Sequence, residues 1–159
     1  MIVIADTTPL NCLVLIGEAA LLPELYGRIV VPGAVHKELL AAGTPPKVRS
    51  WAANRPKWLE VLEAPPGAGS ELPGALDPGE REALALAQTL RADLLLIDDQ
   101  AGRREARRLH LSFTGTLGVL AAAADRGLID LRVTLGRLER TSFYVSPSVL
   151  ARLMEHTRR

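Results

Sequence analysis

Short apolar runs of strand length alternate along this chain with longer stretches of helical periodicity. The run Leu94–Ile97 is continuous and apolar, which is typical of a strand buried on both faces of a sheet. The other strand-length runs are Ile2–Ala5, Arg28–Val31, Leu59–Leu62 and Leu111–Phe113. Strands that alternate with helices are joined by right-handed crossovers and form a parallel sheet covered on both sides. The sequence therefore predicts an α/β fold with three layers, α/β/α, around a central parallel sheet of about five strands.

Proline and capping residues predict where the helices begin. Helices are expected to start at Thr8-Pro9, after Pro32, and at Asp77-Pro78, the last running to about Arg91. Further helices are predicted at Asp99–Leu109, at Thr116–Arg126, and from Ser146 to about Glu155. The stretch Ala64–Gly79 is dense in Pro and Gly and is the only long loop, either a surface connection or a flexible flap.

The length of 159 residues suits a single domain spanning 1–159. Residues 128–159 read as a C-terminal extension of that domain. It contains a short apolar stretch around Leu131–Leu135 and ends in an amphipathic helix with Val149, Leu150 and Leu153 on one face. We expect this helix to pack on the core or on a second subunit.

Composition excludes several classes of protein. Cys12 is the only cysteine, so an internal disulfide and a thiolate zinc site are excluded. The histidines His36, His110 and His156 lack the spacing of metal ligands. No apolar run approaches the roughly 18–20 residues of a membrane span. Met1 leads directly into strand residues, so we expect no signal peptide, no membrane partner and a cytoplasmic protein.

Four acidic residues stand where predicted strands or helices start or stop: Asp6, Glu38, Glu80 and Asp98. In an open α/β sheet, ligands bind outside the carboxyl ends of the strands. Two carboxylates about 4 Å apart repel by roughly 4 kcal/mol at an effective dielectric of about 20. Such repulsion is usually relieved by a raised pKa or by a bound cation. If the four acids converge, the sequence predicts a site of one of these two kinds.

Asp6 and Glu38 each have a plain structural alternative. Asp6 ends a strand that reads as buried, which favours a functional role, but an Asp there also caps the next helix well. Glu38 borders the buried stripe of its helix beside Leu39, and it could equally be a solvated residue paired with Lys37 or Arg49.

The other two acids each have a neighbour that competes for the same role. At 100° per residue, Glu80 borders the apolar face of its helix and Glu82 points away from it. Glu80 could instead belong to a capping box with Asp77. Asp98 and Asp99 end the buried strand together and point oppositely, so one can face the site while the other caps the following helix. The pattern alone leaves that choice open.

The acids lie in motifs that resemble those of the PIN-domain family of metal-dependent ribonucleases. The resemblance covers nearly the whole chain and is closest to a branch of small prokaryotic proteins described as predicted nucleic acid-binding. Its motifs are Ile4–Leu10 (IADTTPL), Val31–Leu39 (VPGAVHKEL), Gly79–Ala87 (GEREALALA), Leu94–Asp99 (LLLIDD) and Thr114–Leu120 (TGTLGVL). Each motif is weak alone, whereas their order and spacing together are fairly specific.

The resemblance implies a site made of Asp6, Glu38, Glu80 and Asp98, with Thr7 in support. The family more often has Asp at the third position, so Glu82 is a spare for Glu80, and Asp99 is a spare for Asp98. Oxygen-only ligands suit Mg²⁺ or Mn²⁺ rather than zinc. One or two such ions would activate a water and hold the scissile phosphate of RNA.

Arginine outnumbers lysine sixteen to three, which favours bidentate contacts with phosphate or carboxylate. Arg103, Arg104, Arg107 and Arg108 follow Asp98 on one helix and could bind the RNA backbone, unless they form an ordinary solvated face. The resemblance also implies a homodimer and the toxin half of a VapC-like toxin–antitoxin pair, bound by a small antitoxin. The alternative is a PIN fold with little catalysis, acting as a module that binds nucleic acid or a partner.

Overall fold

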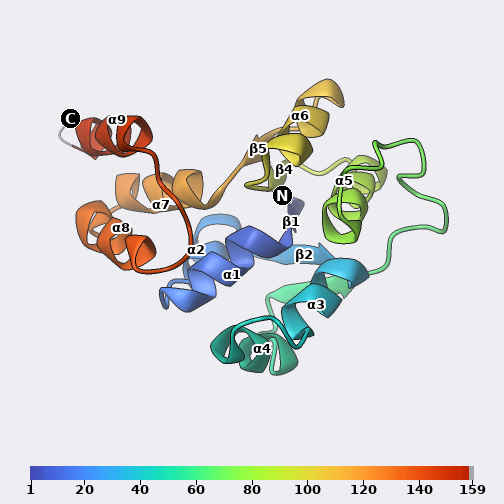
Figure 1. The fold of residues 1–159 in the computed structure, drawn as a ribbon, viewed down its shortest axis with the longest axis horizontal. Helices are drawn as coiled ribbons and strands as arrows, with labels where there is room; N and C mark the ends of the chain where they lie inside the picture. Colours follow the sequence, from blue (N-terminus) through green and yellow to red (C-terminus); the bar gives the residue numbers. More distant parts are fainter. Residues whose placement is uncertain (158–159) are drawn as a thin grey trace.

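One parallel sheet of five strands, in the order β3-β2-β1-β4-β5, organises the molecule (Figure 1). The structure is a computed structural model that describes residues 1–157, with side chains described through Glu155. Within these residues the strands are β1 (Val3–Ala5), β2 (Ile29–Pro32), β3 (Leu59–Leu62), β4 (Leu94–Leu96) and β5 (Phe113–Thr114). All the neighbouring pairs are parallel. The predicted parallel sheet is confirmed.

Helices cover both faces of this sheet, so the predicted three-layer α/β/α arrangement is also confirmed. The described helices are α1 (Thr7–Leu15), α2 (Leu21–Tyr26), α3 (Gly33–Leu40), α4 (Pro46–Ala53), α5 (Pro78–Leu90), α6 (Gln100–Arg108), α7 (Thr116–Asp125), α8 (Leu131–Glu139) and α9 (Pro147–Thr157). None of the helices in the described part of the chain has the length and apolar character needed to cross a membrane.

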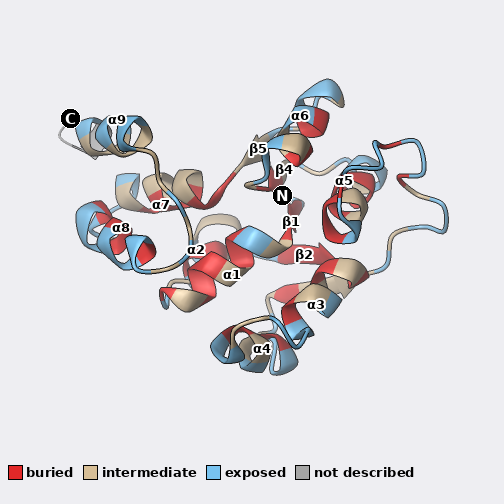
Figure 2. Cartoon of the chain, in the orientation of Figure 1, coloured by how far each residue is buried: buried red, intermediate tan, exposed pale blue. Residues whose placement is uncertain are grey.

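Alternate strand residues point into two separate hydrophobic cores, as the pleat of a strand requires. Val3 and Ala5 of β1 face a larger core formed with α1 to α4, α7 and α8. Ile4 faces a smaller core formed mainly with α5 and α6. In β4, Leu96 and Leu95 divide between the two cores in the same way. Figure 2 shows the resulting buried stripes on α1 and α5, the helices that pack on opposite faces.

The long loop between β3 and α5 is anchored rather than free. Leu72 and Leu76 are buried in the smaller core. Arg81 of α5 donates hydrogen bonds to the carbonyls of Gly69 (2.9 Å), Leu72 (3.0 Å) and Pro73 (2.6 Å). Of the two possibilities that the sequence left open, these contacts favour a surface connection held against α5 over a flexible flap.

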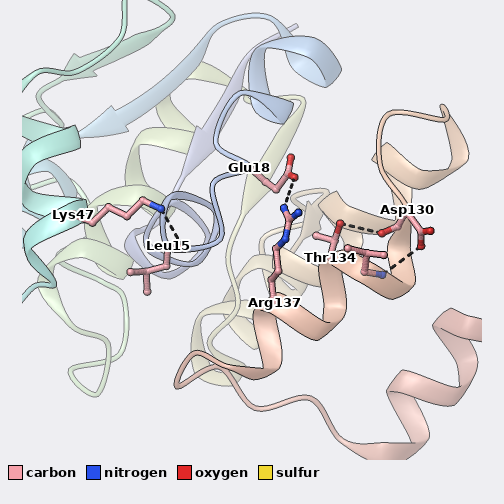
Figure 3. A network of polar contacts seen from close by, with 7 residues as sticks. Leu15, Glu18, Lys47, Asp130, Thr134 and Arg137 are labelled. Carbon is pink, nitrogen blue, oxygen red and sulfur yellow. Dashed lines mark hydrogen bonds and ion pairs between the residues drawn. The ribbon is translucent and has the colours of Figure 1, made fainter.

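The C-terminal helices α7, α8 and α9 lie together at one end of the molecule (Figure 1). Leu131, Leu135 and Leu138 of α8 are buried in the larger core. Figure 3 shows that Arg137 also pairs with Glu18 at 3.4 Å, an exposed ion pair that contributes at most about 1 kcal/mol. The predicted extension therefore packs on the core, although residues 158 and 159 at its end lie outside the described part.

Candidate active site

Asp6 and Asp98 meet at the point where the strand order of the sheet reverses. β1 and β4 are neighbours with Ala5 opposite Leu96, and the Asp6 N–H donates to the Leu96 carbonyl at 2.9 Å. From this pair, β2 and β3 extend the sheet in one direction and β5 in the other. The crevice outside such a switch point is where open α/β sheets bind ligands. The fold therefore places both aspartates at its expected binding edge.

Asp6 is buried with one oxygen lacking any partner among the described residues. Its exposed fraction is 4%, and its Oδ1 accepts no hydrogen bond. The pKa of Asp6 is raised to about 7, first by burial and further by the charges of Asp77, Glu38 and Asp98, against a hydrogen bond from the Thr7 backbone that lowers it. An ionised Asp6 is consequently short of positive charge.

Glu38 reaches this group from α3 and is held by two donors. The Thr7 hydroxyl donates to its Oε2, and the backbone N–H of Gly79 donates to its Oε1 at 3.0 Å. A Cβ at position 79 would lie 2.6 Å from that Oε1, so only glycine allows the approach. Thr7 and the first turn of α5 thus orient the Glu38 carboxylate.

Asp98 is oriented by Thr116 at the start of α7. The Thr116 N–H donates to Oδ1 at 2.9 Å and its hydroxyl donates to Oδ2 at 2.6 Å. Burial raises the pKa of Asp98, whereas these bonds and the charge of Arg103 lower it. Asp99 instead caps α6, accepting from Ala101 N (3.0 Å) and Gly102 N (3.2 Å). The structure therefore separates the two roles that the Asp98–Asp99 pair left open.

Glu80 lies between α5 and α6, among a second set of acids. It is buried, with an exposed fraction of 8%, and its Oε2 lies near Gly102 in the first turn of α6. The pKa of Glu80 is raised to about 9, first by burial and further by hydrogen bonds and charges of Asp77 and Asp99. Loss of the proton from the Glu80 carboxyl is therefore disfavoured by burial and by those two aspartates.

Asp77 connects the two sets of acids and was overlooked as a site residue. Its Oδ1 caps α5 by accepting from Glu80 N at 2.8 Å. Among the carboxylate charges that raise the pKa of Asp6, the charge of Asp77 has the largest effect. Thr116 was overlooked as well, although it opens α7 directly after a strand. For Asp77 the sequence signal was a helix-capping pattern, and Thr116 was marked only as the first residue of a predicted helix, so neither signal indicated a second role.

Glu82 caps a different helix. Its Oε1 accepts from the backbone N–H of Ala34 at 3.3 Å, in the first turn of α3. Because α3 packs against α5, the side of α5 opposite its apolar face is partly covered rather than open to water. Glu82 thus has a structural partner in the backbone of α3, and its use as a spare ligand finds no support in this contact.

The four arginines of α6 have four different environments. Arg103 donates from Nε to the Ile97 carbonyl at 2.9 Å, and its Cζ lies 5.4 Å from the centroid of the Phe113 ring. Arg107 lies at the same distance from that ring. Arg108 pairs with Glu105 at 2.7 Å. Arg104 is exposed.

The acids suit a divalent cation in chemical kind, although they do not form a finished coordination shell. Within the described residues, no group of three or more Asp, Glu, His or Cys side chains is placed so as to hold a metal ion. The carboxylate oxygens of Glu38 instead accept hydrogen bonds from Thr7 and Gly79, and those of Asp98 accept hydrogen bonds from Thr116. Without a cation, mutual repulsion favours such internal bonds. The buried, unpartnered Oδ1 of Asp6 nevertheless fits a hard cation, because that oxygen has no other source of positive charge.

Comparison with protein families agrees with the fold and the acidic edge. A family model described as a PIN domain matches residues 2–159. The chain therefore belongs to the PIN-domain family, whose members are typically nucleases that use divalent metal ions. Comparisons with curated proteins and with solved structures give no match. Family membership supports a nuclease-like, nucleic-acid-binding function.

Proposed function

We propose that the protein is a ribonuclease that depends on Mg²⁺ or Mn²⁺ and hydrolyses RNA phosphodiester bonds at the Asp6 edge of the sheet. The observation that carries the proposal is the Asp6 carboxylate. It is buried, one of its oxygens has no described partner, and the charges of Asp77, Glu38 and Asp98 act on it. A group in that condition is stabilised by a cation more than by any side chain near it.

Asp6, Glu38 and Asp98 would hold the ion, with the third or fourth ligand coming from α5. Glu80 is the ligand that the family motif assigns, while the charge of Asp77 acts directly on Asp6. When bound, Mg²⁺ or Mn²⁺ polarises the phosphodiester and neutralises charge on the leaving 3′ oxygen. Oxygen ligands without histidine or thiolate suit these hard ions.

The residues of the chain itself orient these ligands and manage their protons. Thr7 and Gly79 fix Glu38, and Thr116 fixes Asp98, so two carboxylates are positioned before any ligand arrives. Asp6 holds a proton over much of the range below pH 7 in the absence of a cation. Binding of the ion requires loss of that proton, so affinity for the ion should rise with pH through the neutral range.

The proposal is tested by RNA cleavage and by metal binding in parallel. We expect the wild type to cleave a labelled single-stranded RNA with Mg²⁺ or Mn²⁺ and not with EDTA. Asp6→Asn should abolish cleavage and weaken Mn²⁺ binding measured by calorimetry. Glu71→Gln removes an exposed carboxylate from the long loop and serves as the matched control. A wild type that neither cleaves RNA nor binds Mn²⁺ would refute the nuclease assignment.

A second candidate is a binding module with little catalysis. The observation in its favour is that no ready-made ion site exists among the described acids. It predicts RNA or protein binding that Asp6→Asn leaves unchanged, with no metal dependence.

We further propose, on the family resemblance alone, a homodimer that acts as the toxin of a toxin–antitoxin pair. A short antitoxin-like reading frame beside the gene, and neutralisation of the nuclease by its product, would support that role. Sedimentation of the purified chain as a monomer would contradict the dimer.

A further inference from the structure

Arg103 reaches back from α6 to the acidic edge of the sheet and is held there at two points. Its Nε donates to the Ile97 carbonyl at 2.9 Å, one residue before Asp98. Its guanidinium carbon lies 5.4 Å from the centroid of the Phe113 ring. A hydrogen bond at one end and a ring contact fix the plane of a group that is otherwise flexible. Arg103 is therefore pre-positioned.

The free end of the guanidinium lies beside the Asp98 carboxylate, above Gly115. A Cβ at position 115 would lie 2.3 Å from Asp98 Oδ1 and 2.5 Å from Arg103 Nη2. Both side chains are described, yet they form no ion pair within 4.0 Å. The charge of Arg103 still lowers the pKa of Asp98. The two groups thus flank one small space that a glycine leaves open.

The other arginines of α6 lack this placement. Arg108 is engaged by Glu105, and Arg107 contacts the Phe113 ring without a described bond to the strand ends. Arg104 is exposed and next to Arg103 in sequence. Of the four, Arg103 is the one whose charge acts on an acid of the candidate site.

We propose that Arg103 is a catalytic residue that binds a non-bridging oxygen of the scissile phosphate through its Nη atoms. This inference rests on the proposed ribonuclease function. With Nε occupied by Ile97, the Nη N–H groups donate to no other described side chain or carbonyl and are free for a phosphate. A fixed cation beside carboxylates offsets the repulsion between those carboxylates and an approaching phosphate, and it stabilises charge that develops in the transition state.

The test compares Arg103→Ala with Arg132→Ala, which removes an exposed arginine of α8, in two assays. In single-turnover cleavage at saturating enzyme, Arg103→Ala should lower the rate constant by about 100-fold or more. Arg132→Ala should leave that rate constant within about threefold. Arg103→Lys should recover only part of the rate, because a point charge cannot reproduce the planar fork.

The second assay is equilibrium RNA binding in EDTA, which does not require catalysis. The RNA carries either a normal phosphate or a neutral methylphosphonate at the linkage that the wild type cleaves. The wild type and Arg132→Ala should bind the methylphosphonate more weakly than the normal RNA. Arg103→Ala should bind both equally, because the contact to that oxygen is already lost. Arg103→Gln keeps an N–H donor for Ile97 and replaces the alanine variant if the latter fails to fold.

The outcomes separate this inference from the function on which it rests. If Asp6→Asn abolishes cleavage while Arg103→Ala and Arg132→Ala behave alike in both assays, the ribonuclease stands and the role of Arg103 is overturned. If Arg103→Ala still discriminates against the methylphosphonate, the contact is also overturned. If the wild type cleaves no RNA, the proposed function fails and the inference fails with it.

Discussion

Asp6→Asn should make the protein more stable while removing the proposed nuclease activity. The pKa of Asp6 is raised from 3.8 to about 7. One pKa unit corresponds to about 1.36 kcal/mol, so ionisation of this carboxyl in the folded state is opposed by about 4 kcal/mol. Asn preserves the shape of the side chain and cannot ionise. The variant therefore lacks the destabilisation that ionisation of the buried Asp6 carboxyl causes in the wild type.

The sign of the pH dependence follows from the direction of the shift. Because the folded-state pKa lies above the unfolded value, the contribution of Asp6 to stability is fully present below about pH 3.8. It is lost progressively as pH rises, and the loss is complete above about pH 7. The free energy of unfolding of Asp6→Asn should accordingly equal that of the wild type at about pH 4 and exceed it by about 2–4 kcal/mol at about pH 8.

Urea unfolding in EDTA at a series of pH values measures this difference. The series should stop near pH 8, because the pKa of Glu80 is raised to about 9 and its ionisation would add a second effect. Glu71→Gln provides the control and should match the wild type at every pH. If Asp6→Asn exceeds the wild type in free energy of unfolding by the same amount at pH 5 and at pH 8, the reasoning is refuted. A buried group that ionises must make this difference depend on pH.

Three further predictions test individual contacts. Asp77→Asn retains a good helix cap but loses a charge beside Asp6. It should therefore weaken Mn²⁺ binding, measured by calorimetry, more than Glu80→Gln does. The reverse order would favour Glu80 as the ligand. Gly115→Ala should destabilise the fold by roughly 1–3 kcal/mol in urea unfolding, whereas Gly136→Ala, with nothing within 4 Å of the new Cβ, should stabilise it by about 0.5–1 kcal/mol. Arg81→Ala should make residues 64–77 sensitive to limited proteolysis, and an unchanged cleavage pattern would contradict the anchoring role of this side chain.

Most of the sheet could be predicted because its strands are buried on both faces. An uninterrupted apolar run such as Leu94–Ile97 has few other solutions, and the observed strand differs from it only at its last residue. The two missed helices, α2 and α4, are short and carry proline near their starts. Their apolar residues do not repeat often enough to establish a helical period. The stretch around Leu131–Leu135, described only as apolar, forms α8 because Asp130 caps it and three leucines reach the larger core.

The candidate site was only partly predictable. The sequence indicates where a residue lies along a strand or helix, whereas the direction of its side chain also depends on which elements pack against it. That Asp6 and Asp98 lie at one edge follows from parallel strands alone. That Glu80 turns towards α6 depends on where α6 packs, and no pattern within α5 contains it. Likewise Glu82 meets the first turn of α3 through tertiary packing. The assignment of Glu80 as a ligand stays a prediction. Burial raises the pKa of Glu80, so this carboxyl would have to lose a proton against that shift in order to bind a cation.

The same physical property explains why caps and ligands were hard to separate in this chain. A helix N-terminus presents backbone N–H groups and a partial positive charge, so it attracts carboxylates whether or not a metal is nearby. Here the N-termini of α5, α6 and α7 all point at acids: Asp77 accepts from α5, Asp99 from α6 and Asp98 from α7. Asp77 and Asp98 are both held by a helix end, and both have charges that raise the pKa of Asp6. A helix end can therefore orient one carboxylate without donating a hydrogen bond to the acid beside it, and Asp6 receives no such bond at Oδ1.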